Sequence, residues 1–428
     1  MQEITKPMNE QSQFEDLFDV EKEAKRRHGA ALTDDIYPRL AELRRQTPVM
    51  RGSLHELFGH GVPAELFIKE RPHYVTLNFA AADRALNEND LFSSRIWDEH
   101  FGIRAVGRTI LNMVGEEHRH VRGAVQTMFT MLHANRWWKP KWIEGIVEEL
   151  VSAFEKDGRT DLNQTLCAKL PMLTITRALG LDDSDAVSFR HDLVVSVMFT
   201  TPADERAKAA AAVRATLLKA MDVRRDAPRE DILSGLMRAE IADEDGRRRK
   251  LTDDEVLNYC RILMIAGGGT TWRQLGITLM ALLSEPENWE RIKADRSLIE
   301  PAIRESLRWN CTDPLFFRLV ERDTELCGVQ LPAGAILEVC LGAANRDPSR
   351  WENPDRFDLD RPRQRHLGFA GGPHTCLGMF VAQAEMQVAL NVLADRFPRL
   401  RLDPHATPPT MAGGLDARGV THMQVRFD

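Results

Sequence analysis

Apolar residues recur along most of the chain with the period of an amphipathic α-helix. Residues 141–155 are one example, because their isoleucines, valines, leucine and phenylalanine fall on one stripe. Strand-like patterns are limited to residues 73–77 and to parts of residues 324–339. The pattern therefore predicts a mostly α fold with a minor β part.

No internal repeat and no low-complexity linker divides the sequence, so we expect a single domain over residues 31–428. Residues 1–30 are highly charged and lack the apolar stretch of a secretory signal. We expect them to form a mobile N-terminal segment that can include a short helix.

The longest helical pattern, residues 253–284, carries three glycines at its centre. Thr252 and Glu255 fit a capping box at its start, and Pro286 follows its end. Each Gly costs about 1 kcal/mol relative to Ala in a helix interior. Two explanations stay open: two shorter helices meet at a glycine hinge, or the backbone approaches something bulky and flat, with threonine hydroxyls in a local helix distortion.

Composition narrows the class of protein. The 428 residues include 57 Lys+Arg and 64 Asp+Glu, a formal charge of −7, which argues against nucleic-acid binding as the main role. No apolar run is long enough to cross a membrane. The six cysteines show no CxxC spacing, which is typical of free thiols in a reducing compartment. We therefore expect a soluble, cytoplasmic protein.

One cysteine is placed for metal chemistry. Cys376 lies in a glycine-rich segment, residues 369–378, directly before a helical pattern. A helix N-terminus favours a thiolate, and flanking glycines let backbone N–H groups approach a ligated sulfur. A single thiolate with no other metal ligand nearby suits a haem, whose porphyrin supplies four in-plane donors. The alternative is a buried structural cysteine in a glycine-rich turn.

The segment resembles the haem-binding signature of the cytochrome P450 family, F-x-x-G-x-H-x-C-x-G. Only Ala370 departs from it, where the family usually has glycine. The resemblance implies the cytochrome P450 fold, a triangular prism of helices around one buried haem b, with Cys376 as the iron ligand. The residues that match are Phe369, Gly372, His374, Cys376 and Gly378.

The same resemblance implies haem contacts elsewhere in the chain. His118 and Arg122 lie at i and i+4 of one predicted helix and resemble partners of the two propionates. Taken alone, an exposed basic helix face is the better explanation of this pair, and the resemblance around Cys376 reverses that preference. Arg318 and His374 match the other propionate partners, and Ala266 matches a contact on the long helix. Phe369 and Gly378 complete the expected cofactor contacts.

Glu305 and Arg308 match the E-x-x-R motif of the family. This spacing recurs elsewhere in the chain, so its weight comes from its position and from Arg356, which is similar to the third partner. The resemblance implies a buried Glu–Arg–Arg network. Its expected role is structural, to hold the segment before the cysteine loop.

Residues 266–271 resemble the oxygen-activating segment of the family. Thr270 matches the threonine that passes protons to bound oxygen, so Thr270 and Cys376 are the expected catalytic residues. Gly269 stands where the family has a carboxylate, so the usual acid of the proton relay is missing. A water-filled route, a polar group of the substrate and a different use of the haem all remain open.

The substrate contacts implied by the resemblance are largely aliphatic or phenyl. They favour a small to medium apolar substrate, with aromatic and terpenoid-like skeletons among the candidates. Packing in the core is an equally good explanation for each phenylalanine, and the substrate itself cannot be identified from the sequence. The candidate residues are Phe199, Ile262, Ile265, Ala266, Pro314 and Phe316.

The resemblance also implies partners. The basic run at residues 361–366 would lie on the side where an acidic 2Fe-2S ferredoxin docks, and Arg119 and His120 add basic residues on the predicted propionate helix. No flavin or ferredoxin sequence is fused to the chain, so we expect electrons from NAD(P)H through a separate ferredoxin and ferredoxin reductase.

The expected function is that of a bacterial-type haem-thiolate monooxygenase, a monomer that binds neither nucleic acid nor membrane. It would insert one atom of O2 into its substrate by hydroxylation or O-dealkylation. Two rivals remain: a peroxygenase that uses hydrogen peroxide directly, and a haem protein that binds or senses ligands without turnover.

Overall fold

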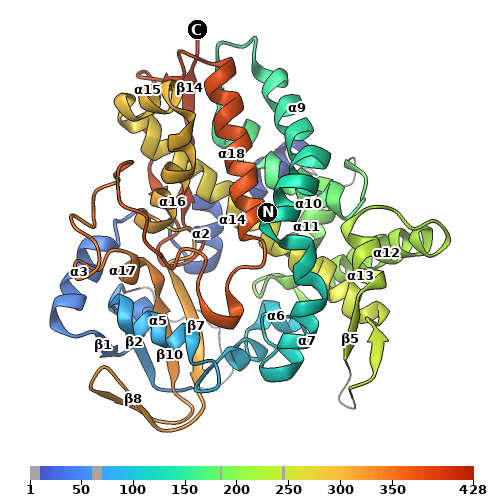
Figure 1. The fold of residues 1–428 in the computed structure, drawn as a ribbon, viewed down its shortest axis with the longest axis vertical. Helices are drawn as coiled ribbons and strands as arrows, with labels where there is room; N and C mark the ends of the chain where they lie inside the picture. The colour runs from blue at the N-terminus through green and yellow to red at the C-terminus, as the bar shows by residue number, and fades with distance from the viewer. Residues whose placement is uncertain (1–9, 60–69, 184–185, 243–245) are drawn as a thin grey trace, which may run out of the picture.

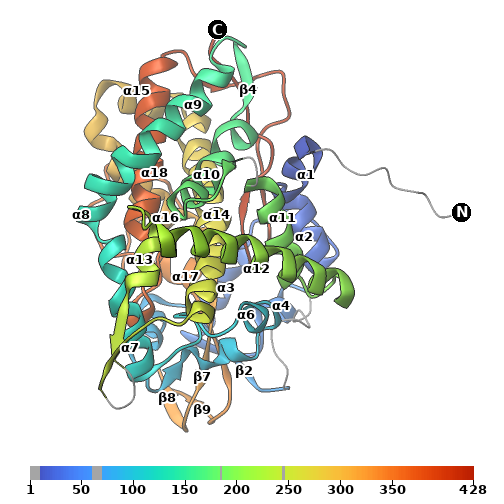
Figure 2. The same ribbon diagram turned by 90° about the vertical axis from the view of Figure 1, so that its right-hand side faces the viewer.

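Helices make up most of the molecule, and short strands supply the rest of its regular structure (Figures 1 and 2). The computed structural model describes residues 10–428 except 60–69, 184–185 and 243–245. The prediction of a mostly α fold with a minor β part is confirmed. Within the described ranges, no helix is both long and apolar enough to cross a membrane.

The central element is helix α14 (Asp253–Ser284), which runs through the interior. Its capping box is present as predicted, because the Thr252 and Glu255 side chains each bond the other's backbone N–H. The helix continues without a break through its three glycines, so the glycine-hinge explanation is wrong. A Cβ on Gly268 would lie 2.6 Å from Arg190 Nη1. A side chain at position 268 would therefore have to displace the guanidinium of the buried Arg190, which packs against the helix.

Several helices pack against the sides of α14, and one more lies behind them. Helix α10 packs directly against α14, as do α16 and α18, and α9 packs against α10 and α18. A π-helical stretch that includes Pro140 leads into α9, where the sequence predicted a regular helix from residue 141. The bounds are Ala134–Ile143 for η3, Glu144–Phe154 for α9, Lys169–Ala178 for α10, Ile299–Trp309 for α16 and Met379–Arg396 for α18.

The main sheet lies at the lower end of the view in Figure 1 and has the strand order β1-β2-β10-β7-β3. Strand β10 runs parallel to β2 and antiparallel to β7, which places Leu337 opposite Arg318. The sheet thus carries Arg318 on an inner strand. Its strands are β1 (Val49–Arg51), β2 (His73–Thr76), β3 (Phe92–Ser93), β7 (Leu315–Val320) and β10 (Ile336–Cys340).

The other elements lie around this frame. The remaining helices are α3 (Tyr37–Gln46), α4 (Leu54–Leu57), α5 (Phe79–Asn87), α6 (Phe101–Val106), α7 (Gly115–Gln126), α8 (Met131–His133), α11 (Ala186–Val197), α12 (Ala203–Asp226), α13 (Ile232–Arg238), α15 (Pro286–Ala294) and α17 (Leu341–Asn345). The remaining strands are β4 (Arg159–Asp161), β5 (Glu240–Ala242), β6 (Arg248–Lys250), β8 (Thr324–Leu326), β9 (Val329–Leu331), β11 (Arg401–Leu402), β12 (Met411–Ala412), β13 (Gly419–Val420) and β14 (Gln424–Arg426).

The N-terminal segment forms two helices, α1 (Glu10–Leu17) and α2 (Val20–His28), and is part of the packed fold. Phe14 and Phe18 are buried in the core. Glu23 of α2 forms an ion pair with Arg273 of α14. The expectation of a mobile segment is therefore wrong for residues 10–28, because these apolar and charged side chains fix it to the central helix. Residues 1–9 lie outside the described part of the chain.

Candidate active site

Cys376 lies in the loop between a short 3-10 turn, Gly372–His374, and helix α18. The Cys376 backbone N–H donates to the Phe369 carbonyl at 3.0 Å, and the Gly378 N–H donates to the Cys376 sulfur. Gly372 has φ +64°, and a Cβ there would collide with the Leu86 carbonyl. Only glycine therefore fits at position 372.

Ala370 adopts a left-handed backbone conformation, with φ +57°. An L-residue with a Cβ loses about 1 kcal/mol or more in this region, whereas glycine does not. This geometry explains why glycine suits this position of the signature and why alanine is a mild departure from it.

The Cys376 thiol lines an internal cavity instead of being packed within the core. Its exposed surface therefore faces this cavity. Burial raises the pKa of this thiol, while the Gly378 N–H and the positive charge of Arg122 act in the opposite direction. Without a bound cation, burial therefore outweighs the groups that favour the thiolate. A cation bound to the sulfur would lower the pKa of the thiol, since coordinated thiols are deprotonated.

The cavity beside Cys376 has a volume of about 330 Å³. One wall is helix α14, with Ala266, Thr270 and the glycine backbone between them. Opposite are the cysteine loop and the first turns of α18. The lining is mainly apolar, and its size lies at the lower end of the range of small-molecule sites.

Next to the cysteine lies a cluster of buried donors without an acidic partner. Arg318 is 2% exposed and its Nε has no hydrogen-bond partner among the described residues. The same holds for Nε2 of His118 and of His374, whose rings are 4.1 Å apart. Arg122 completes the cluster and donates to the Thr375 carbonyl at 2.6 Å.

This cluster of donors carries positive charge and has no negatively charged partner in the part of the chain that the structure describes. Burial lowers the pKa of His118 to about 4, with Arg122 adding to the effect. Burial together with the charge of Arg318 lowers the pKa of His374 to about 2. A buried guanidinium and two unpaired ring nitrogens are costly unless an anion meets them. Two carboxylates in the position of haem propionates fit this donor set.

Thr270 is half-buried on the cavity wall, and its hydroxyl donates to the Ala266 carbonyl at 3.0 Å. Behind Gly269 lie two buried arginines. Arg273 donates to the Gly269 carbonyl and pairs with Glu23, whose pKa falls to about 2 because the charges of Arg273 and its neighbours outweigh burial. Arg190 packs beside the same glycines. The place of the usual acid is thus flanked by guanidinium groups.

One acid of this cavity escaped the sequence reasoning. Glu385 of α18 is 3% exposed and lines the cavity. Burial raises its pKa to about 8, although a hydrogen bond with Thr174 acts against the rise. The carboxyl is therefore mostly protonated at neutral pH. A lone glutamate within the apolar pattern of residues 379–390 was the available signal.

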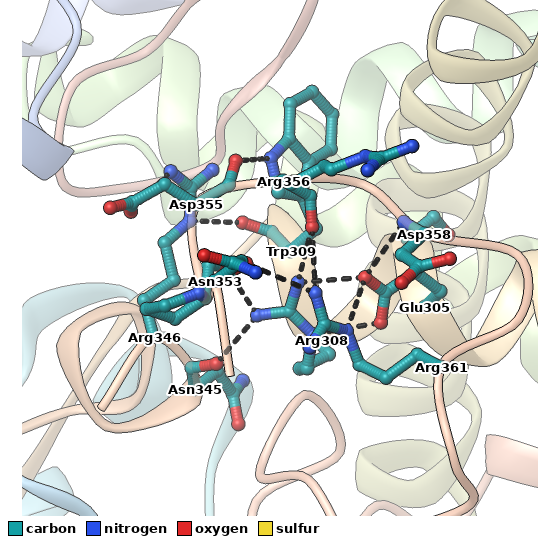
Figure 3. A network of polar contacts seen from close by, with 12 residues as sticks. Glu305, Arg308, Trp309, Asn345, Arg346, Asn353, Asp355, Arg356, Asp358 and Arg361 are labelled. Carbon is teal, nitrogen blue, oxygen red and sulfur yellow. Dashed lines mark hydrogen bonds and ion pairs between the residues drawn. The ribbon is translucent and has the colours of Figure 1, made fainter. Parts of the chain in front are cut away.

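The Glu–Arg–Arg network is present, but its third member is not the predicted one (Figure 3). Glu305 forms a two-fold contact with Arg308, at 2.8 and 2.7 Å, and accepts from Arg361 Nε at 2.8 Å. Arg356 contributes only its backbone carbonyl, which accepts from Arg308 and Arg361, and its side chain is exposed. The prediction of Arg356 is wrong because the turn at 353–361 points that side chain outward.

The structure separates the six candidate substrate residues. Ile265 and Pro314 do not line the cavity, and Phe199 is 46% exposed and packs its ring against Phe101 on the surface. Phe199 is therefore corrected from a substrate contact to a surface residue. The candidates that line the cavity are Ile262, Ala266 and Phe316.

Two arginines of the basic run at residues 361–366 have acidic partners. Arg361 is held by Glu305, and Arg365 pairs with Asp83 at 2.7 Å. Arg363 and Arg365 are exposed, and the docking patch expected at this run stays a prediction. A cleft of about 1010 Å³ borders Cys376 on another side, and its basic lining residues are His118, Arg119, Arg122 and Arg322.

Comparisons with known proteins agree with this geometry. The family profile described as Cytochrome P450 matches residues 184–417. The chain is 32% identical to cytochrome P450 105C1 of a Streptomyces species, over 84% of this chain and 91% of the relative. It is 32% identical to 6-deoxyerythronolide B hydroxylase of Saccharopolyspora erythraea, over 73% and 76%. The crystal structure of CYP109E1 from Bacillus megaterium with testosterone superposes with a TM-score of 0.78 at 26% identity, covering 92% of this chain and all of that one.

Proposed function

The chain belongs to the cytochrome P450 family, and from that we propose that residues 10–428 form one catalytic domain that inserts an oxygen atom from O2 into an organic molecule bound beside Cys376. Enzymes of this family carry haem and receive electrons from NAD(P)H through redox partners. The observation that carries the proposal is the pairing of a cavity-facing cysteine with a buried donor cluster that lacks an anion.

We assign the iron ligand to Cys376 and the propionate contacts to the donor cluster, with Ala266, Phe369 and Gly378 against the ring. Bound there, haem supplies the four in-plane nitrogen donors and, with a thiolate ligand, the chemistry that cleaves the O–O bond. The residues assigned to the propionates are His118, Arg122, Arg318 and His374.

The protein's part is to hold protons and exclude water. The Thr270 hydroxyl can turn from the Ala266 carbonyl toward the cavity, where it can pass on a proton. Glu385 lines the same cavity as a neutral acid, so it can supply the proton that no side chain at Gly269 provides. The apolar lining keeps competing water out.

The substrate has an apolar body of small to medium size, which the apolar cavity residues Ile262, Ala266 and Phe316 support. Hydroxylation and O-dealkylation are the proposed outcomes. A 2Fe-2S ferredoxin is the proposed electron donor, and the cleft with Arg119, Arg122 and Arg322 beside Cys376 supports an acidic partner. All six cysteines are free thiols, which supports a reducing cytoplasmic environment. The proposed oligomeric state is a monomer.

The first test is the visible spectrum of the reduced protein with bound carbon monoxide. We expect the red-shifted Soret band of a haem-thiolate protein, lost in Cys376→Ala and kept in Cys327→Ala, which removes an exposed thiol. A spectrum of histidine-ligated haem, or no change in Cys376→Ala, would remove the proposal. Turnover with hydrogen peroxide alone, at the rate of the ferredoxin-driven reaction, would favour a peroxygenase.

A further inference from the structure

Asp313 places a carboxyl group on the wall of an otherwise mainly apolar cavity. It lies in the turn between α16 and β7, shortly before Phe316, which lines the same cavity. Among the described residues, no basic side chain lies within ion-pair distance of this carboxylate. Its contact within the protein is the backbone N–H of Ala417.

The neighbouring polar side chains of this wall are already satisfied by the protein. The Thr312 hydroxyl donates to the Arg418 carbonyl at 2.7 Å. The Gln274 side chain accepts from the Thr312 N–H at 3.1 Å and donates to Ser306 Oγ at 3.2 Å. These groups have little left to offer a ligand. The Asp313 carboxylate keeps unused acceptor capacity, since two oxygens can accept about four hydrogen bonds.

The surroundings of Asp313 favour a positive partner. Burial raises the pKa of this carboxyl, the charge of Arg273 lowers it, the carboxylate of Asp416 raises it, and the charge of Arg27 lowers it to a smaller extent. An ionised acid in such a place is costly unless a cation or a set of donors reaches it. A ligand with a positive nitrogen supplies that partner.

We propose that Asp313 anchors the substrate, and that the substrate carries a cationic amine on an apolar body. The inference rests on the proposed function, because it assigns a substrate class to the same cavity. The charged end would bind at Asp313, and the apolar end would lie against Ile262, Ala266 and Phe316. Asp313 thus acts as a specificity-determining residue, and it fixes which part of the substrate points toward Cys376.

The test compares two probes of the same shape on the haem-loaded protein. One is a phenylethyl trimethylammonium ion, and the other is its neutral carbon isostere, in which a tert-butyl group replaces the ammonium group. A quaternary nitrogen has no lone pair, so it cannot bind iron in place of the substrate. Isothermal titration calorimetry gives both dissociation constants without any turnover.

We expect the wild-type protein to bind the ammonium probe about tenfold or more tightly than the isostere, because only the ammonium probe carries a positive charge for the Asp313 carboxylate. Asp313→Asn should abolish this preference and leave binding of the isostere nearly unchanged. Asp313→Ser repeats the test should the asparagine variant fold poorly. Glu385→Gln is the matched control, because it removes the other acid of the cavity and should keep the preference.

Equal binding of the two probes to the wild-type protein would overturn the inference, and so would a preference that survives in both Asp313 variants. The carbon-monoxide spectrum of the same preparations tests the proposed function separately. A thiolate spectrum without an ammonium preference refutes the amine anchor alone. A wild-type spectrum without thiolate ligation refutes the monooxygenase proposal.

Discussion

Replacing Arg361 by Gln should destabilise the protein, whereas the same replacement at Arg356 should have almost no effect. The Arg361 side chain is 9% exposed and its Nε contacts Glu305 at 2.8 Å. Its two other nitrogens donate to the carbonyls of Glu352, Asn353 and Arg356, at 2.7 to 3.1 Å. The Arg356 side chain has no polar contact within the described structure that would be lost.

The expected loss for Arg361→Gln is about 3 kcal/mol. A buried charged hydrogen bond contributes about 1.5–3 kcal/mol, and each backbone bond adds roughly 0.5–1.5 kcal/mol where solvent does not replace it. The loss stays below that of an isolated buried pair because Glu305 keeps its two bonds to Arg308. Surface changes such as Arg356→Gln usually stay within about 0.5 kcal/mol.

Thermal unfolding of the haem-loaded protein measures the difference. With an unfolding entropy of about 2.1 cal/mol/K per residue, 428 residues give roughly 0.9 kcal/mol/K, so 3 kcal/mol lowers Tm by about 3 °C. The control should move by less than about 1 °C. Equal shifts in both variants, or a larger shift for Arg356→Gln, would refute the assignment of Arg361 as the third member of the network.

Three further changes test the site. Ala370→Gly should raise Tm slightly, by about 1 °C or less, because the relief of a left-handed alanine exceeds the added freedom of the unfolded chain; a fall in Tm would contradict it. Glu385→Gln should reduce the dependence of the protein's stability on pH. The pKa of Glu385 in the folded protein, about 8, lies above the ordinary value of 4.5, so the wild-type protein loses stability as the pH rises between these two values. The loss is up to roughly 1.4 kcal/mol per pH unit. The difference between the Tm at pH 5 and the Tm at pH 8 should therefore be smaller in the variant. Arg318→Leu should speed haem loss to a scavenger protein at least tenfold while leaving the haem-free protein no less stable, because it removes a buried unpaired cation; unchanged haem loss would refute the propionate role.

Features that depend on neighbours in sequence could be predicted from the sequence. The capping box at Thr252 and Glu255 needs only three residues of spacing, and the helix then follows from its apolar content. The glycine-rich loop around Cys376 is likewise local, because its turn requires glycine at position 372, where φ is +64°. Even there, the sequence left a glycine hinge open in the long helix, and only the structure shows that the helix is continuous.

The sequence by itself thus determined the cysteine loop, the helical character and the family. The tertiary structure decided which distant side chains meet. It placed Arg361 rather than Arg356 on Glu305 and kept Phe199 on the surface. It also brought Asp313 and Glu385 to one cavity from elements far apart in the chain. The physical reason is that local spacing fixes backbone conformation, while burial and charge pairing depend on contacts that form only when the elements pack.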